Sequence, residues 1–274
     1  MPSTLNRMRG LRQAHRTPRF FSALRRPGLV AATALALQAQ PVRADEGWHV
    51  SSGPALVVEP QYPGSRGELT LPLPMMDVAY GRWLFANTDH GLGAYIVNND
   101  RWQVGSSLWF RRGRYHDENS KIADLSDLNT AAQGRLFASY VLGPIALGTT
   151  VARDFGGSSG LTIDSNAAWR LQLNSTAQIS VGVQATYGNS RYMQAWFGVT
   201  ADQARASQLP EYSPGAGLRS VGPTASLSYA LSQRWTLMAR ASDEFLTSKA
   251  NGSPIVERNS LPTVAVGVVY RFIP

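Results

Sequence analysis

The stretch that decides the fold reads AQISVGVQATY and spans residues 177–187. Its odd-numbered positions, from Ala177 to Tyr187, are apolar or aromatic, and its even-numbered positions, from Gln178 to Thr186, are small or weakly polar. Alternation with a period of two is typical of a β-strand whose two faces meet different surroundings. The same pattern recurs at 102–110, 167–173, 221–231 and 235–245. No window after residue 44 has the long apolar run of a transmembrane helix, so the sequence predicts an all-β chain.

The second face of these strands indicates the surroundings of the sheet. It carries Gly, Ser, Thr and Gln with an occasional Arg, and the whole chain has only two lysines, Lys121 and Lys249. Aromatic residues such as Trp102 and Trp235 gather near strand ends. Strands with an apolar outer face, a polar inner face and aromatic residues at both rims are typical of an outer-membrane barrel. The sheet must close, because an open sheet edge is not tolerated in lipid. We therefore expect a closed antiparallel transmembrane β-barrel of about twelve strands in the outer membrane of a Gram-negative bacterium, with ten or fourteen as the alternatives.

Residues 45–274 contain twelve candidate strands, and the last of them ends in aromatic residues. The expected ranges are 48–58, 71–80, 82–98, 101–112, 131–142, 145–155, 161–173, 177–188, 190–199, 217–231, 235–246 and 260–272. Two of them are ambiguous, because 82–98 is long enough for two strands and 190–199 has a mixed pattern. Short links would face the periplasm and long ones the outside. Tyr270 and Phe272 in the terminal strand are the expected signal for the barrel-insertion machinery.

The charge of the chain is concentrated at its N-terminus. Lys and Arg number 26 against 18 Asp and Glu, a formal net charge of +8. Residues 1–44 hold eight arginines and no acidic residue, so the chain from Asp45 onward has no net charge and nucleic acid is not an expected partner. A basic region, an apolar run at 29–37 and Val42-Arg43-Ala44 together predict a signal peptide over 1–44, read by the general secretion route. An uncleaved basic arm is the alternative, and translation from Met8 remains open.

The sequence has few residue patterns that indicate a catalytic or metal-binding site. His49, His90 and His116 are widely separated and lack metal-ligand spacing, and the chain has no Cys, so we expect no enzyme, no metal and no cofactor. His116, Asp117, Glu118, Asp124 and Asp127 make an acidic loop, for which a solvated surface is the preferred interpretation over a cation site.

A set of arginines falls on the polar faces of the expected strands. If the apolar faces point to lipid, the lumen receives Arg101, Arg111, Arg135, Arg170, Arg240 and Arg271, opposed by Asp154 and Glu244. An open lumen of this kind would favour anions. The preferred alternative is that these arginines pair with acids and carbonyls and fill a narrow barrel.

Several segments together resemble one family. The segment YMQAWFGVT at 192–200 is followed by Ser207 and by YSPGAG at 212–217, and the segments PQYPGS at 60–65, LPLP at 71–74, SPIV at 253–256 and YRF at 270–272 occur in the same order. These pieces resemble the MipA/OmpV family of outer-membrane proteins, with a departure at Gln208, where the family often has Gly. The residues that carry the resemblance are Tyr192, Phe197, Gly198, Val199, Thr200, Ser207, Tyr212, Ser253 and Pro254.

The resemblance implies a role in the cell envelope. Members of this family are described as scaffolds that join a lytic transglycosylase to a penicillin-binding peptidoglycan synthase, and we expect that non-catalytic role here. The alternative is a narrow pore or permeability protein for small, anionic solutes. In either case we expect a monomer surrounded by outer-membrane lipids.

Overall fold

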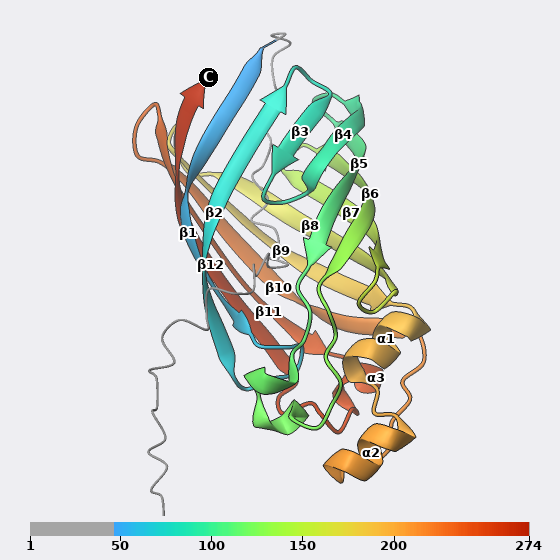
Figure 1. The fold of residues 1–274 in the computed structure, drawn as a ribbon. Helices are drawn as coiled ribbons and strands as arrows, with labels where there is room; N and C mark the ends of the chain where they lie inside the picture. The colour runs from blue at the N-terminus through green and yellow to red at the C-terminus, as the bar shows by residue number, and fades with distance from the viewer. Residues whose placement is uncertain (1–46, 274) are drawn as a thin grey trace, which may run out of the picture.

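Twelve antiparallel strands form one closed barrel in the computed structural model, which describes residues 47–273 (Figure 1). The predicted signal peptide, 1–44, lies outside the described residues. Each strand pairs with its neighbours in the chain, and the first pairs with the last. The strands are β1 (Trp48–Pro60), β2 (Glu68–Tyr80), β3 (Leu84–Asn87), β4 (Gly91–Asn98), β5 (Trp102–Arg111), β6 (Ala131–Leu142), β7 (Ile145–Phe155), β8 (Leu161–Gln172), β9 (Ala177–Gly188), β10 (Gly217–Ala230), β11 (Trp235–Leu246) and β12 (Ser260–Ile273).

The wall of the barrel is apolar on its outer face. In β9, Val181 and Val183 are more than half exposed, whereas Gln184 and Thr186 point inward and are buried. An outward apolar band with an inward polar face suits a barrel that stands in lipid. In the described part of the chain, no helix is long and apolar enough to cross a membrane.

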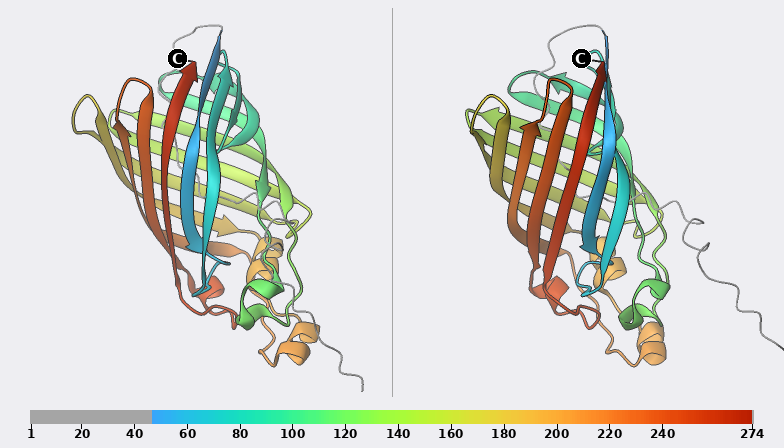
Figure 2. Two further views of the ribbon diagram at one scale, coloured as in Figure 1. Left: turned by 60° about the vertical axis from the view of Figure 1, so that its left-hand side comes forward. Right: turned by 90° about the vertical axis from the view of Figure 1, so that its left-hand side faces the viewer.

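The two ends of the barrel differ in their connections (Figure 2). We call the end that holds Trp48 and Ile273 the turn end, because the strands meet there through short turns such as 143–144 and 232–234. Three aromatic pairs surround this end, with ring centroids 4.4–5.0 Å apart: Trp48–Tyr80, Trp102–Tyr140 and Trp235–Tyr270.

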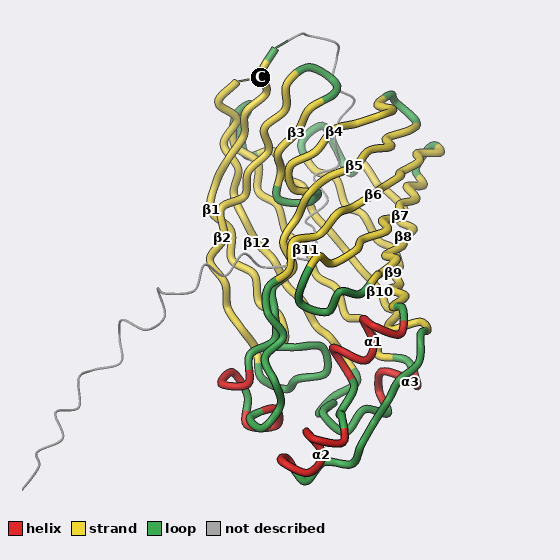
Figure 3. Tube along the Cα trace, turned by 45° about the vertical axis from the view of Figure 1, so that its right-hand side comes forward, coloured by secondary structure: helices red, strands yellow, loops and turns green. Residues whose placement is uncertain are grey.

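The opposite end, the loop end, carries all the helices of the described chain (Figure 3). These are the short 3-10 helices η2 (His116–Glu118) and η3 (Ser120–Ile122) and the α-helices α1 (Ser190–Phe197), α2 (Ala201–Ser207) and α3 (Ser248–Asn251). The loops at 61–67, 112–130, 189–216 and 247–259 therefore all gather at one end of the barrel.

The structure confirms the closed twelve-stranded antiparallel barrel and corrects two of the expected ranges. The range 82–98 is two strands, β3 and β4, because Gly91 adopts a φ of +85° and turns the chain between them. The strand expected at 190–199 is wrong, and helix α1 stands there. Asn189 caps this helix by accepting a hydrogen bond from the backbone N–H of Tyr192. The buried residues of α1 are Tyr192, Met193, Trp196 and Phe197, a helical spacing rather than an alternation.

The lumen has two kinds of lining. Inward side chains of β1, β2, β11 and β12 form a packed apolar cluster of Ala55, Val57, Met75, Met238, Ala265 and Val269. The charged inward side chains come mainly from β5 to β11, on the other side of the barrel. The functional site is built on that charged side.

Candidate functional site

The four long loops pack together into a hydrophobic cap at the loop end. Its buried members, which we call the loop cap, are Tyr62, Ile122, Leu125, Leu128, Tyr192, Met193, Trp196, Phe197, Val199, Leu246, Ala250, Ile255 and Leu261. A cluster of this size and burial behaves like the core of a small domain. The loops are therefore held as one unit over the barrel.

Buried hydrogen bonds fasten the loops of the cap to one another. The Tyr62 hydroxyl donates to the carbonyl of Ile255 at 3.0 Å, and Arg114 Nη1 donates to the carbonyl of Trp196 at 3.0 Å. Burial lowers the pKa of Arg114, although Tyr62 and Asp127 partly offset that effect. Each bond joins two different loops, so each stabilises the closed arrangement.

All nine residues that carry the family resemblance lie in two of the loops that form the cap, 189–216 and 247–259, and Tyr192, Phe197 and Val199 are buried members of it. Tyr192 and Phe197 belong to α1, Gly198 ends that helix, and Val199 pairs with Tyr212 through an isolated bridge. A Cβ on Gly198 would lie 2.4 Å from the carbonyl oxygen of Gln194, so the turn needs glycine.

The remaining members of this set also make cap contacts. Thr200 caps α2 and Ser207 ends it, and the Tyr212 hydroxyl donates to the carbonyl of Lys249 at 2.8 Å. Ser253, next to Pro254, donates to the carbonyl of Phe197 at 2.5 Å. The positions quoted for the family therefore share one structural environment.

Below the cap, a cavity of about 600 Å³ extends along the charged side of the lumen. Tyr62, Tyr192 and Trp196 of the cap line it at the loop end, and 99–101 line it at the turn end. Its charged lining consists of seven arginines and five carboxylates: Arg101, Arg111, Arg112, Arg135, Arg170, Arg219, Arg240, Glu59, Asp89, Asp100, Asp164 and Glu244.

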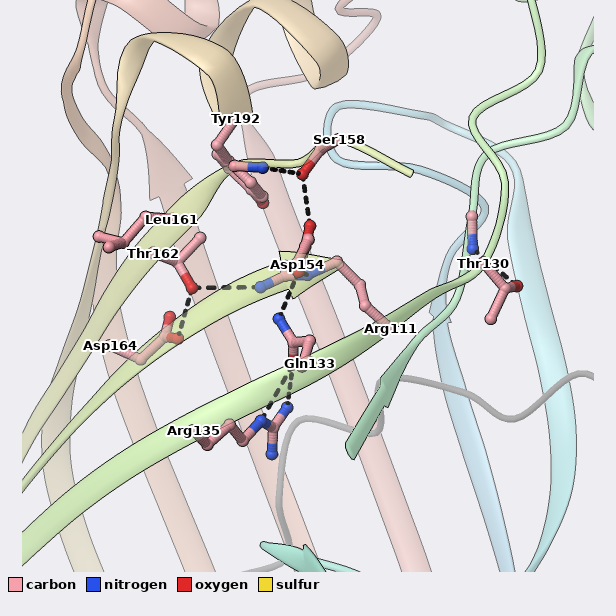
Figure 4. A network of polar contacts seen from close by, with 12 residues as sticks. Arg111, Thr130, Gln133, Arg135, Asp154, Ser158, Leu161, Thr162, Asp164 and Tyr192 are labelled. Carbon is pink, nitrogen blue, oxygen red and sulfur yellow. Dashed lines mark hydrogen bonds and ion pairs between the residues drawn. The ribbon is translucent and has the colours of Figure 1, made fainter. Parts of the chain in front are cut away.

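One group of polar contacts in the barrel is centred on Asp154 (Figure 4). Its carboxylate accepts from Arg111 Nε at 3.2 Å, from Gln133 Nε2 at 2.8 Å and from the hydroxyl of Ser158. Arg111 also donates to the Thr162 hydroxyl at 3.1 Å. Arg111 and Asp154 thus form an ion pair in which the carboxylate is only 2% exposed and accepts three hydrogen bonds.

A second group is centred on Glu244. Its carboxylate accepts from Arg219 Nη2 at 3.0 Å, from Gln184 Nε2 at 2.9 Å and from the hydroxyl of Ser220. Alternation alone does not predict Arg219 in the lumen, because it places Arg219 on the lipid face with Val221. A register shift between Leu218 and Ser220 breaks the alternation and turns Arg219 inward.

Four arginines of the cavity, Arg101, Arg135, Arg170 and Arg240, lack a carboxylate within ion-pair distance in the described chain, and the last three of them are largely buried. Arg135 donates to Gln133 Oε1 and to the backbone carbonyl of Asp89, and it lies over the ring of Trp109. Arg240 donates to Gln184 Oε1 at 2.6 Å. The Nε atoms of Arg170 and Arg240 are buried and donate to no acceptor among the described residues. Burying a guanidinium group without a carboxylate in direct contact is costly, and an anion in the cavity would relieve that cost.

The expected lumen residues therefore fall into two places. Arg101, Arg111, Arg135, Arg170, Arg240 and Glu244 line the large cavity, whereas Arg271 lines a separate cavity of about 210 Å³ near the turn end. Tyr270 and Phe272 lie on the outer face at the turn end, with ring centroids 4.8 Å apart, and Tyr270 accepts from Arg234 Nη1 at 2.9 Å.

The histidines and the acidic loop are dispersed. His90 stacks on Phe137 inside the barrel, with centroids 4.3 Å apart, while His116 pairs with Asp127 at 2.7 Å in the loop 112–130. Within residues 47–273, no three His, Asp or Glu side chains are arranged to hold a metal ion.

Comparison with solved structures finds two porins and an outer-membrane secretin among the chains with some similarity to this one. The NanC porin structure covers 81% of this chain and 98% of its own at 12% identity and a TM-score of 0.40. The KdgM porin covers 82% and 99% at 10% identity and 0.39. A structure described as a bacterial polysaccharide outer membrane secretin covers 83% and 99% at 10% identity and 0.43. With TM-scores below 0.5, these structures say nothing about what this barrel carries.

A match at the level of the sequence family is more extensive. No curated protein is similar enough to the chain to count as a relative. The family model described as MltA-interacting protein MipA matches residues 53–272, which is nearly all of the barrel. This chain therefore belongs to the MipA family.

Proposed function

We propose that the chain is a non-catalytic scaffold of the outer membrane that holds a lytic transglycosylase and a penicillin-binding peptidoglycan synthase at the inner face of that membrane. The family to which the chain belongs is described by its interaction with another protein. The apolar outer face of the barrel favours an integral position in lipid. A cleaved leader over 1–44 and insertion as a monomer by the barrel-insertion machinery belong to the same proposal.

The observation that carries this proposal is the packed loop cap. Its thirteen buried members come from four loops and the adjoining ends of β11 and β12, and Tyr62, Tyr192, Trp196 and Leu261 among them line the loop end of the cavity. A barrel capped in this way is better suited to presenting a protein-binding surface at the membrane than to letting solutes pass through its lumen. Outer-membrane barrels place short turns in the periplasm, so the turn end would face the peptidoglycan.

The turn end offers a surface for such partners. Arg82, Trp83, Asp100, Arg101 and Arg234 all lie in its turns, and we call this set the turn-end surface. Trp83 is 53% exposed there. Tryptophan and arginine are over-represented among the residues that dominate protein interfaces.

A pull-down tests the scaffold directly. The detergent-extracted barrel is immobilised and offered the transglycosylase and the synthase separately. We expect retention of both, with at least a tenfold loss of affinity in the variant W83A/R101A. Arg205→Ala on α2, an exposed arginine at the other end of the barrel, is the control and should bind like the wild type. If neither enzyme is retained by the wild type, the scaffold function is wrong.

A narrow pore is the second candidate, and the arginine-lined cavity favours it. A cavity that extends from 99–101 to the cap under a basic lining could conduct small anions if the cap opened. Conductance measurements distinguish this function from the scaffold.

A further inference from the structure

The wall of the barrel is incomplete between β2 and β5. The hairpin of β3 and β4 stands between these two strands, but β3 has only four residues. It pairs with 77–80 of β2, and β4 pairs with 103–108 of β5. Nearer the loop end, 68–75 of β2 and 109–111 of β5 have no strand partner among residues 47–273 on the sides that face each other. In Figure 1 the far wall of the barrel is visible through this break, beside the β3–β4 hairpin.

The sequence of β2 fits a free edge at this place. The backbone N–H of Met76 donates to the Thr88 hydroxyl at 2.8 Å, and the Met76 carbonyl accepts from the Thr88 N–H at 2.9 Å, so the backbone of Met76 faces the hairpin. Backbone groups two residues apart in a strand face the same side. The nitrogens of Pro72 and Pro74 therefore face the break, where proline has no N–H to donate.

These prolines decide what can cover the edge. A strand from another chain would need donors at both positions, and proline is one of the devices that prevents strand addition. Unpaired carbonyls are not tolerated against hydrocarbon, but they are tolerated beside a hydrated cavity. The break is thus better suited to a hydrated opening than to a protein contact.

The large cavity lies directly behind the break. Its lining includes Glu59 at the end of β1, Asp89 and His90 at the tip of the β3–β4 hairpin, and Arg111 and Arg112 at the end of β5. Arg135 reaches the same tip, because its Nη1 donates to the Asp89 carbonyl at 3.2 Å. The hairpin tip and the β5 rim of the break are therefore also walls of the cavity, whereas the inward Leu73 and Met75 of the β2 rim pack in the apolar cluster.

We propose that the break between β2 and β5 is a lateral portal through which the phosphate headgroup of a membrane lipid enters the arginine-lined cavity. Three guanidinium groups there, on Arg135, Arg170 and Arg240, have no carboxylate partner, and Arg135 stands at the portal. Guanidinium groups bind phosphate through several charge-assisted hydrogen bonds. The acyl chains stay in the bilayer against the exposed Pro72, Pro74 and Met76. In the orientation proposed above, the portal opens to the outer leaflet.

Lipid binding tests the headgroup site. The delipidated protein in detergent is titrated with phosphatidic acid and, separately, with phosphatidylcholine and inorganic phosphate, and binding is followed by native mass spectrometry. We expect saturable binding of phosphatidic acid, at least tenfold weaker in Arg135→Gln. Arg205→Gln is the matched control and should bind like the wild type, and heat-dependent migration on gels verifies that each variant is folded. Equal binding by the wild type and R135Q, or inorganic phosphate competing as well as the lipid, would overturn the proposal.

Blocking the portal tests the route. The sequence contains no cysteine. The variants Pro72→Cys and Leu136→Cys therefore each have a single thiol that a maleimide can label. Position 72 edges the portal, whereas Leu136 is 61% exposed on the outer face of β6. A bulky maleimide at position 72 should reduce phosphatidic acid binding at least tenfold, and the same label at position 136 should not. Equal binding by both labelled proteins would show that lipid does not enter here. Neither assay contains a murein enzyme. A negative result here would therefore contradict the portal without contradicting the scaffold function, which the pull-down tests.

Discussion

At the scale of single residues, the ion pair between Glu244 and Arg219 is, like that between Asp154 and Arg111, largely isolated from water. The side chains of Glu244 and Arg219 are only 7% and 13% exposed, and three donors converge on the carboxylate. Glu244→Gln keeps a group of the same shape that can accept from Ser220, but it leaves Arg219 without its counter-charge. Breaking a buried pair in this way costs about 3 kcal/mol.

Urea unfolding in detergent micelles measures that loss. Asp202→Asn is the matched control, because its partner Arg205 is 78% exposed and Asp202 itself 89% exposed. An exposed pair contributes at most about 1 kcal/mol. If the two variants lose the same stability, the Glu244 group does not stabilise the barrel in the way its contacts indicate.

A second residue, Tyr62, makes the cap sensitive to alkaline pH. Burial, and then the neighbouring carboxylate of Glu257, raise the pKa of Tyr62 above about 10, its value in an unfolded chain. A raised folded-state pKa means that the folded protein holds the proton more tightly. The contribution to stability is complete below pH 10 and declines as the pH rises above it.

Tyrosinate absorbance measures this ionisation. The titration curve of the wild type minus that of Tyr62→Phe should isolate one group with a midpoint above pH 10. A midpoint at or below 10 would contradict a buried hydroxyl that donates to the Ile255 carbonyl.

At the scale of elements, alternation predicts strands well wherever the two faces of a strand meet lipid and lumen. It places β6, β7 and β9 at or within a residue of their ends. It fails in α1, because the apolar residues of the 190–199 segment pack on other loops and follow a helical spacing. It also misses Arg219, because one irregularity in register reverses the face of every residue beyond it. Both failures depend on contacts between distant segments, which a single sequence does not display.

The prolines of β2 give a prediction at this same scale. Replacing Pro72 and Pro74 with valine restores two N–H donors to the free edge and raises its strand propensity. We expect light scattering of the detergent complex to show dimers of P72V/P74V, formed by edge-to-edge pairing, and a monomeric wild type. Pro223→Val is the control, because β10 has β9 and β11 on its two sides. A monomeric double variant would mean that the prolines are not what keeps this edge unpaired.

At the scale of the whole molecule, the packed cap and the incomplete wall together give the cavity a side entrance and a closed outer end. The cap is assembled from loops that are up to about 190 residues apart in the chain, such as those of Tyr62 and Ile255. Weakening the cap should therefore change the access to the lumen without changing the barrel. Phe197 is the residue for this purpose, because it is fully buried in the cap and lies outside every strand.

Conductance across a planar bilayer tests this arrangement. The wild type should conduct rarely, whereas Phe197→Ala, which removes about 3–5 kcal/mol of packing from the cap, should open more often and favour anions. Adding R170Q and R240Q should reduce that preference, because both arginines line the cavity without a carboxylate partner. Val183→Ala on the outer face of β9 is the control and should behave like the wild type. Steady conductance by the wild type would show that the cap does not seal the barrel, and a preference for cations would mean that the arginines do not set the field inside it.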